Sequence, residues 1–231
     1  MKKVVIACAV SLLATSAFAA LSSDEVKRLT DAGAIVNELR SAPDKGIPEE
    51  LWDKAECVVV IPGLKKGAFV VGGEYGSGVM SCRKGAEWSA PVFMQMMKGS
   101  WGLQIGGQET DLVLLIMNRR GLDKLLQDKV SLGADASVAA GPVGRTGAAA
   151  TDAQLHAEML TYSRSRGVFA GVDLSGGVLK PDNNAIERAY GKNANARDIA
   201  MGTAHVATPQ PATAFLRSLK NSETRATTGQ K

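Results

Sequence analysis

The sequence is poor in the residues that most often carry catalysis or stack on nucleic-acid bases. Only 5% of its 231 residues are aromatic, too few for a stacking platform that binds single-stranded nucleic acid. Histidine occurs twice, as His156 and His205, and neither has a second ligand at a metal-binding spacing. The chain also has no G-x-S-x-G nucleophile elbow and no G-x-x-x-x-G-K-[ST] phosphate loop. These absences predict a protein that is not an enzyme and that uses no cofactor, metal or nucleic acid.

Long apolar runs are equally scarce, and the one at the N-terminus has the organisation of an export signal. Lys2-Lys3 is a short basic segment, residues 4–13 are apolar, and Ala17-Phe18-Ala19 has the spacing of a cleavage site. This order predicts a secretory signal peptide over residues 1–19 and a mature chain that is periplasmic or secreted. The alternative is an N-terminal membrane anchor, which the short run and its small-residue end disfavour.

The charge balance changes when the leader is removed. Lys2 and Lys3 leave with it, so the 27 basic side chains become 25 against 23 acidic ones, and the net charge falls from +4 to +2. A net charge this small exerts no general attraction on nucleic acid. Any anionic partner must therefore be bound by a local group of basic residues.

Cysteine is also rare, with three in the chain and two after Cys8 leaves with the signal peptide. Export would place Cys57 and Cys82 in an oxidising compartment, where a disulfide can form. The expected strands argue the other way, because a hairpin that turns near Lys65 places Cys57 opposite a residue near position 73. The sequence leaves both alternatives open, a Cys57–Cys82 disulfide and two buried free thiols.

Glycine is the residue in excess, with 25 in the chain, many of them inside apolar runs that read as strands. Glycine weakens a strand unless the sheet bends sharply or another backbone approaches closely. The pattern therefore predicts an α+β fold with a strongly curved, Gly-rich, mainly antiparallel sheet or barrel-like core, flanked by short helices. No polar linker interrupts the chain, so we expect one domain over residues 20–220 and a flexible tail over residues 221–231.

The first helix is expected to begin at Ser22. Ser22 and Glu25 have the spacing of a capping box, apolar residues recur at helical intervals, and Pro43 ends the pattern. This pattern is typical of a helix that packs on the core of a domain. The alternative is an amphipathic helix that lies on a membrane surface.

Several Gly-punctuated segments follow one another in a fixed order along the chain. They are AECVVVIPG (55–63), KKGAFVVGG (65–73), YGSGV (75–79), WSAP (88–91), GLQIGGQ (102–108), DLV (111–113), LGADASVAAGPVGR (132–145), YSRSRGVFAGV (162–172) and AYG (189–191). Together they resemble the SYLF family, also called the Ysc84 or lipid-binding SYLF domain. The resemblance covers roughly residues 24–205.

The resemblance implies non-enzymatic binding of phospholipids, phosphoinositides among them. Eukaryotic members of the family couple this binding to actin and carry SH3 or FYVE domains, which this sequence does not contain. The export signal would separate the chain from actin filaments. We therefore expect an anionic phospholipid or membrane surface as the partner, in a bacterial envelope, and we regard actin as an unlikely partner.

Basic residues at expected turns and strand ends are the candidate lipid contacts. They are Lys65, Lys66, Arg119, Arg120, Arg145, Arg164 and Arg166. Each basic side chain at an anionic surface contributes about 1 kcal/mol, so four would give only a millimolar interaction, about 4 kcal/mol. Useful affinity then needs a headgroup pocket or inserted apolar surface.

Two other interpretations of the chain are consistent with its sequence. The basic pairs could be ordinary solvated turn charges. A small barrel could also enclose an apolar ligand, which would make the protein a carrier.

Overall fold

The computed structural model describes residues 21–41, 46–69, 71–101, 109–127, 129–144, 156–165 and 168–220. The expected signal peptide over residues 1–19 and the expected tail over residues 221–231 lie outside these ranges, as do Arg145 and Arg166. Within the described ranges, no helix is both long and apolar enough to cross a lipid bilayer.

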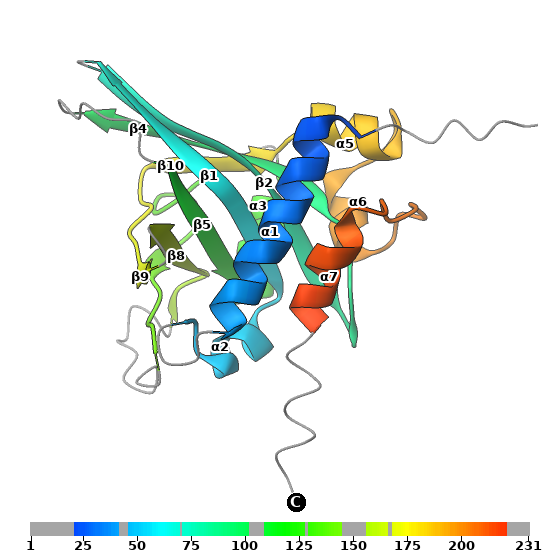
Figure 1. The fold of residues 1–231 in the computed structure, drawn as a ribbon, viewed down its shortest axis with the longest axis horizontal. Helices are drawn as coiled ribbons and strands as arrows, with labels where there is room; N and C mark the ends of the chain where they lie inside the picture. Colours follow the sequence, from blue (N-terminus) through cyan, green and yellow to red (C-terminus); the bar gives the residue numbers. More distant parts are fainter. Residues whose placement is uncertain are drawn as a thin grey trace, which may run out of the picture.

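The described strands form one curled, open sheet with helices around it (Figure 1). The sheet order is β6-β10-β4-β2-β1-β5-β8-β7, with β3 paired to β2 and β9 paired to β8. The pairing of β7 with β8 is parallel, and the other described pairs are antiparallel. The expected α+β fold with a strongly curved, mainly antiparallel sheet is therefore confirmed.

The bounds of the elements are as follows. The strands are β1 (Cys57–Phe69), β2 (Val71–Lys84), β3 (Glu87–Trp88), β4 (Val92–Trp101), β5 (Glu109–Ile116), β6 (Val130–Ser131), β7 (Val138–Ala140), β8 (Met159–Ser165), β9 (Val168–Gly171) and β10 (Gly177–Pro181). The helices are α1 (Ser23–Ser41), α2 (Glu49–Lys54), α3 (Arg119–Leu125), α5 (Asn183–Tyr190), α6 (Ala196–Met201) and α7 (Ala212–Lys220).

Helix α1 begins with the expected capping box. The backbone N–H of Ser22 donates to Glu25 Oε2 at 2.7 Å, and the N–H of Glu25 donates to Ser22 Oγ at 3.3 Å. The helix lies in front of the sheet with α7 beside it (Figure 1). Gly33 allows the two helices to come close, because a Cβ there would lie 3.1 Å from the backbone nitrogen of Phe215.

Strands β1 and β2 form a hairpin that is longer than the sequence suggested. Cys57 pairs with Cys82, and the pairing continues to Phe69 opposite Val71, so the expected turn near Lys65 is wrong. Pro62-Gly63 has the composition of a strand end, but a register shift between Val60 and Lys65 keeps these residues inside β1. The longer hairpin brings Cys57 and Cys82 together, and the structure joins them by a disulfide.

Two glycines let β2 lie tightly against this irregular part of β1. A Cβ on Gly78 would lie 2.0 Å from the carbonyl oxygen of Val60, and one on Gly76 would lie 2.5 Å from Ile61 Cγ2. No larger residue fits at Gly78 unless the backbone of β1 moves. The glycines of this strand therefore mark a close backbone approach, as the sequence pattern indicated.

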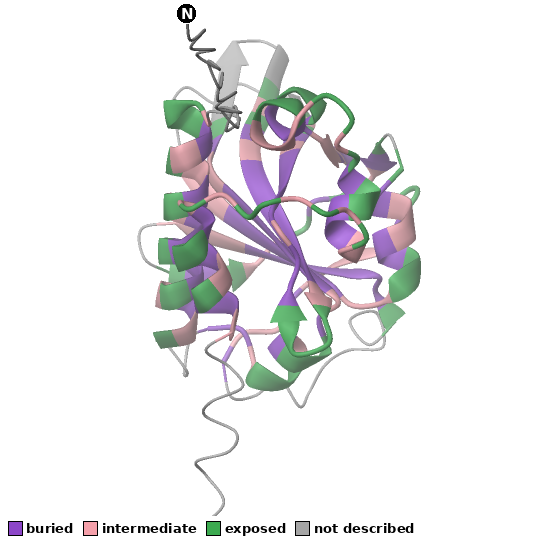
Figure 2. Ribbon diagram, turned by 90° about the vertical axis from the view of Figure 1, so that its right-hand side faces the viewer, coloured by how far each residue is buried: buried purple, intermediate pink, exposed green. Residues whose placement is uncertain are grey.

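The core ends part of the way along β1. Residues 57–61 are fully buried and Leu64 is 1% exposed, whereas Lys65 is exposed. Figure 2 shows buried residues along the middle of the central strands. Beyond Leu64, the face of the sheet that meets α1 changes from apolar to polar, and this change creates the site described next.

Candidate functional site

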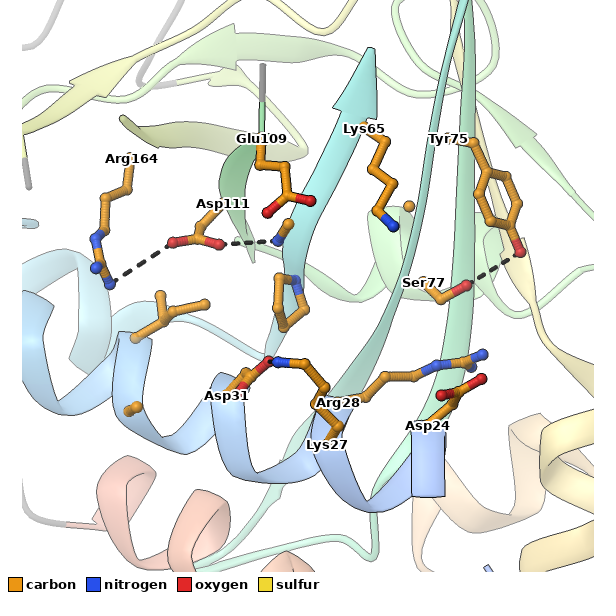
Figure 3. Close-up of a pocket in the computed structure, with 15 residues that line it drawn as sticks. Asp24, Lys27, Arg28, Asp31, Lys65, Tyr75, Ser77, Glu109, Asp111 and Arg164 are labelled. Atoms are coloured by element: carbon orange, nitrogen blue, oxygen red, sulfur yellow. Dashed lines mark hydrogen bonds and ion pairs between the residues drawn. The ribbon is translucent and has the colours of Figure 1, made fainter. Parts of the chain in front are cut away.

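A cleft of about 760 Å³ lies between α1 and the polar ends of β1, β2 and β5 (Figure 3). One wall is α1 and the other is the sheet. The lining residues are Asp24, Lys27, Arg28, Asp31, Ala34, Ile35, Pro62, Gly63, Lys65, Tyr75, Gly76, Ser77, Glu109, Asp111 and Arg164. Most of them are polar or charged, so the cleft suits a polar group better than an apolar one.

Three neighbouring strands place a row of side chains across the sheet wall. Lys65 on β1 pairs with Tyr75 on β2 and with Glu109 on β5. Directly paired residues lie on the same face of a sheet, with Cβ atoms about 5 Å apart. The backbone register therefore sets a phenol, an ammonium and a carboxylate side by side, facing α1.

A second group of contacts fixes the bend of β1 beneath this row. Gly63 has a φ of +57°, which favours glycine, and its N–H donates to Asp111 Oδ1 at 2.8 Å. Arg164 on β8 lies 3.6 Å from the other oxygen of Asp111 and 2.8 Å from Glu38 Oε2 on α1. Asp111 and Arg164 thus hold the sheet wall to the helix wall.

The helix wall presents its own ion pairs. Lys27 pairs with Asp31 at 2.5 Å, and Arg28 donates to Asp182 at 2.8 Å. The bond to Asp31 raises the pKa of Lys27, with smaller contributions from Glu109 and Asp111 across the cleft. Glu109 and Asp111 of the sheet wall line the same cleft as Lys27.

Two charged groups in the row lack such pairing. Lys65 and Glu109 form no ion pair with each other or with another described residue, and both point into the cleft in Figure 3. Beside Lys65, the hydroxyl of Tyr75 lies 3.1 Å from Ser77 Oγ. With respect to the described residues, the row therefore contains one unpaired cation, one unpaired anion and two hydroxyls on a rigid support.

The structure brings two of the expected contact residues, Lys65 and Arg164, into this one cleft. Arg119 and Arg120 lie elsewhere, on α3 after the far end of β5. The length of β5 separates α3 from Glu109 by about 23 Å at roughly 3.3 Å per residue. Arg119 and Arg120 therefore do not share a headgroup with Lys65.

Ion pairs engage both arginines of α3. Arg120 lies 3.1 Å from Glu158, and Arg119 lies 4.0 Å from Asp123. Both side chains are exposed, so these pairs contribute little to stability. They form a separate polar patch and not a second part of the cleft.

Lys65 and Lys66 were expected to project together from a tight turn, and this expectation is wrong. Both lie inside β1, where Lys66 pairs with Glu74 in the backbone register. The remaining candidates, Arg145 and Arg166, lie outside the described residues.

Sequence reasoning missed the acidic and hydroxyl members of the cleft. Tyr75 and Ser77 alternate along β2, and Glu109 and Asp111 alternate along β5, which is the pattern of one polar strand face. That signal was present in the sequence. The register of β2 and β5 with β1 places both pairs of residues in the same cleft. That register could not be predicted once the turn was placed near Lys65.

The sequence of the chain supplies a family assignment. Residues 97–222 match the Ysc84 family, whose description is "Las17-binding protein actin regulator". The chain belongs to this family, as its ordered segments predicted.

Curated relatives support the assignment over most of the chain. LAS seventeen-binding protein 3 of Saccharomyces cerevisiae is 34% identical over 163 residues, which cover 69% of this chain and 35% of the relative. Protein YSC84 of the same yeast is 32% identical over 77% of this chain and 38% of its own length. The human SH3 domain-containing YSC84-like protein 1 is 33% identical over 76% of this chain and 50% of its own length. The chain thus spans between about a third and a half of these relatives.

Proposed function

We propose that this chain binds anionic phospholipid at a membrane surface of the bacterial envelope, without turnover. The observation that carries the proposal is the cleft, in which Lys65 forms no ion pair with another described residue and the paired cations Lys27, Arg28 and Arg164 lie in the same lining. A phosphate in such a cleft receives charge-assisted hydrogen bonds that a flat surface does not supply. The cleft thus provides the headgroup pocket that a few surface charges need for useful affinity.

Export from the cytoplasm is part of the proposal. The N-terminal pattern of basic, apolar and small residues is that of a signal peptide. The Cys57–Cys82 disulfide supports the same location, because disulfides form and persist in oxidising compartments. An exported chain does not meet actin, so the lipid-binding property is the one that we transfer from the family.

A catalytic role for Glu158, the acid nearest in sequence to His156, is not supported by its surroundings. Lys124 Nζ lies 2.9 and 2.8 Å from the two carboxylate oxygens, and the N–H of Ser137 donates to Oε2 at 2.9 Å. Burial raises the pKa of Glu158, but these bonds outweigh it and hold the pKa below its ordinary value. Glu158 therefore serves as a structural anion between α3, β7 and β8.

The structure favours a headgroup site over an apolar carrier. Large side chains on both faces of the sheet, such as Phe93, Met94, Met96 and Tyr162, are fully buried against the described core. The described cleft is lined by eight charged residues. An apolar ligand there would have to desolvate those charges without compensation.

Liposome co-sedimentation at two salt concentrations tests the proposal. The purified chain is expected to bind vesicles that contain phosphatidylglycerol, to bind phosphatidylcholine vesicles weakly, and to lose affinity as salt rises. Equal binding to neutral and anionic vesicles would contradict the proposal. An apolar molecule extracted from the purified protein, without vesicle binding, would favour the carrier.

A further inference from the structure

The charges that line the cleft are balanced, and this balance limits what it can bind. Four basic side chains face four acidic ones. The bases are Lys27, Arg28, Lys65 and Arg164, and the acids are Asp24, Asp31, Glu109 and Asp111. A ligand with several negative charges would meet as many carboxylates as cations. The lining therefore suits a ligand that itself carries both signs.

Most of these charges are already engaged. Lys27, Arg28, Asp31, Asp111 and Arg164 take part in the ion pairs described above. Asp24 lies in the first turn of α1, where the helix dipole stabilises a carboxylate. Within the part of the chain that the structure describes, the charged groups of the sheet wall left to meet a ligand are Lys65 and Glu109.

Lys65 has the surroundings of an anion subsite. The hydroxyls of Tyr75 and Ser77 lie beside it (Figure 3). They share one hydrogen bond of 3.1 Å, which uses one of their two protons and leaves the other to donate. An ammonium and a free hydroxyl donor together can hold two oxygens of a phosphate.

Glu109 has the position of a cation subsite next to it. The carboxylate can accept hydrogen bonds from a primary ammonium, and its cross-strand pairing with Lys65 sets the Cβ atoms of the two residues about 5 Å apart on one face of the sheet. A phosphate and an amine joined by two carbons span a distance of this order. We propose that the cleft binds a phosphoethanolamine group, with the phosphate at Lys65 and Tyr75 and the ammonium at Glu109.

This proposal rests on the proposed function and makes it more specific. An anionic surface attracts the chain, and the cleft then selects a phospholipid headgroup that carries a primary amine. The same chemistry exists in a free phosphoethanolamine ester. Vesicle and soluble ligands therefore distinguish the two sources.

Calorimetric titration of the purified chain tests the cleft itself. Phosphoethanolamine is expected to bind about tenfold more tightly than inorganic phosphate or ethanolamine, because both subsites are filled. Glu109→Gln should remove the advantage of phosphoethanolamine over phosphate and should not weaken phosphate binding, because it removes a negative charge beside the phosphate subsite. Lys65→Gln should weaken both ligands. Glu50→Gln, an exposed change on α2, is the matched control and should alter neither.

Vesicle binding supplies the second arm. At a constant fraction of phosphatidylglycerol, exchange of phosphatidylcholine for phosphatidylethanolamine should strengthen binding several-fold in the parent but not in Glu109→Gln. Circular dichroism confirms that each variant is folded.

The outcomes separate this proposal from the proposed function. If binding to anionic vesicles changes neither with the ethanolamine lipid nor with Glu109→Gln, the headgroup site is overturned and membrane binding is left intact. Soluble phosphoethanolamine binding without vesicle binding would support the site and overturn its membrane role.

Discussion

Removal of the Cys57–Cys82 disulfide should lower the stability of the chain measurably. The bond joins residues 25 apart in sequence at the open end of the β1–β2 hairpin. A closed loop of that length restricts the unfolded chain by about 3.5 kcal/mol in the chain-entropy model. For a protein of this size, such a loss corresponds to a fall in Tm of roughly 10 °C.

The test compares the parent chain with a Cys57→Ala/Cys82→Ala variant by urea unfolding. The two cysteines are 0% and 2% exposed, and alanine introduces no polar group into that site. Thiol titration of the unfolded parent without reductant should find the two cysteines blocked. Two free thiols in exported protein, or an unchanged free energy of unfolding in the variant, would refute the reasoning.

Three further predictions concern residues that stabilise the fold. Gly78→Ala should destabilise the chain by about 3 kcal/mol or prevent folding, because the new Cβ would meet the Val60 carbonyl. A soluble variant with the Tm of the parent would contradict this prediction. Glu25→Gln should reduce the free energy of unfolding by about 2 kcal/mol, because Glu25 is fully buried and accepts from Ser22 and Arg188; urea unfolding measures it, and an unchanged midpoint would argue against it. The pKa of Glu158 in the folded chain is below its ordinary value, so its contribution to stability is present at neutral pH and is lost as the pH falls through the folded pKa. When unfolding is measured from pH 7 towards about pH 3, the acid-induced loss of stability should be smaller in Glu158→Gln than in the parent.

The sequence specified the fold class because its signals were local. Apolar runs with internal glycines indicated curved strands, and the spacing of Ser22 and Glu25 indicated a helix start. Each of these signals depends on residues close together in the chain. The structure reproduces them without a change of interpretation.

The cleft depended on register, which the sequence did not determine. Pro62-Gly63 has the composition of a strand end, yet Asp111, 48 residues further along, accepts the Gly63 N–H and lets β1 continue. Moving the turn from Lys65 to the far end of β1 changes every cross-strand partner. Only the tertiary contact with β5 distinguishes the two registers, so the row of Tyr75, Lys65 and Glu109 was not predictable.

The most direct test of membrane binding through the cleft compares Lys65→Glu with Arg119→Glu in co-sedimentation with phosphatidylglycerol vesicles at low salt. Both residues are exposed cations and both changes reverse one charge, but only Lys65 lines the cleft. A reversal at an anionic surface changes the binding free energy by about 2 kcal/mol, close to thirtyfold in affinity. We predict that Lys65→Glu loses binding to this extent and that Arg119→Glu stays within about twofold of the parent. Equal losses in both variants, or a loss in Arg119→Glu alone, would contradict binding through the cleft.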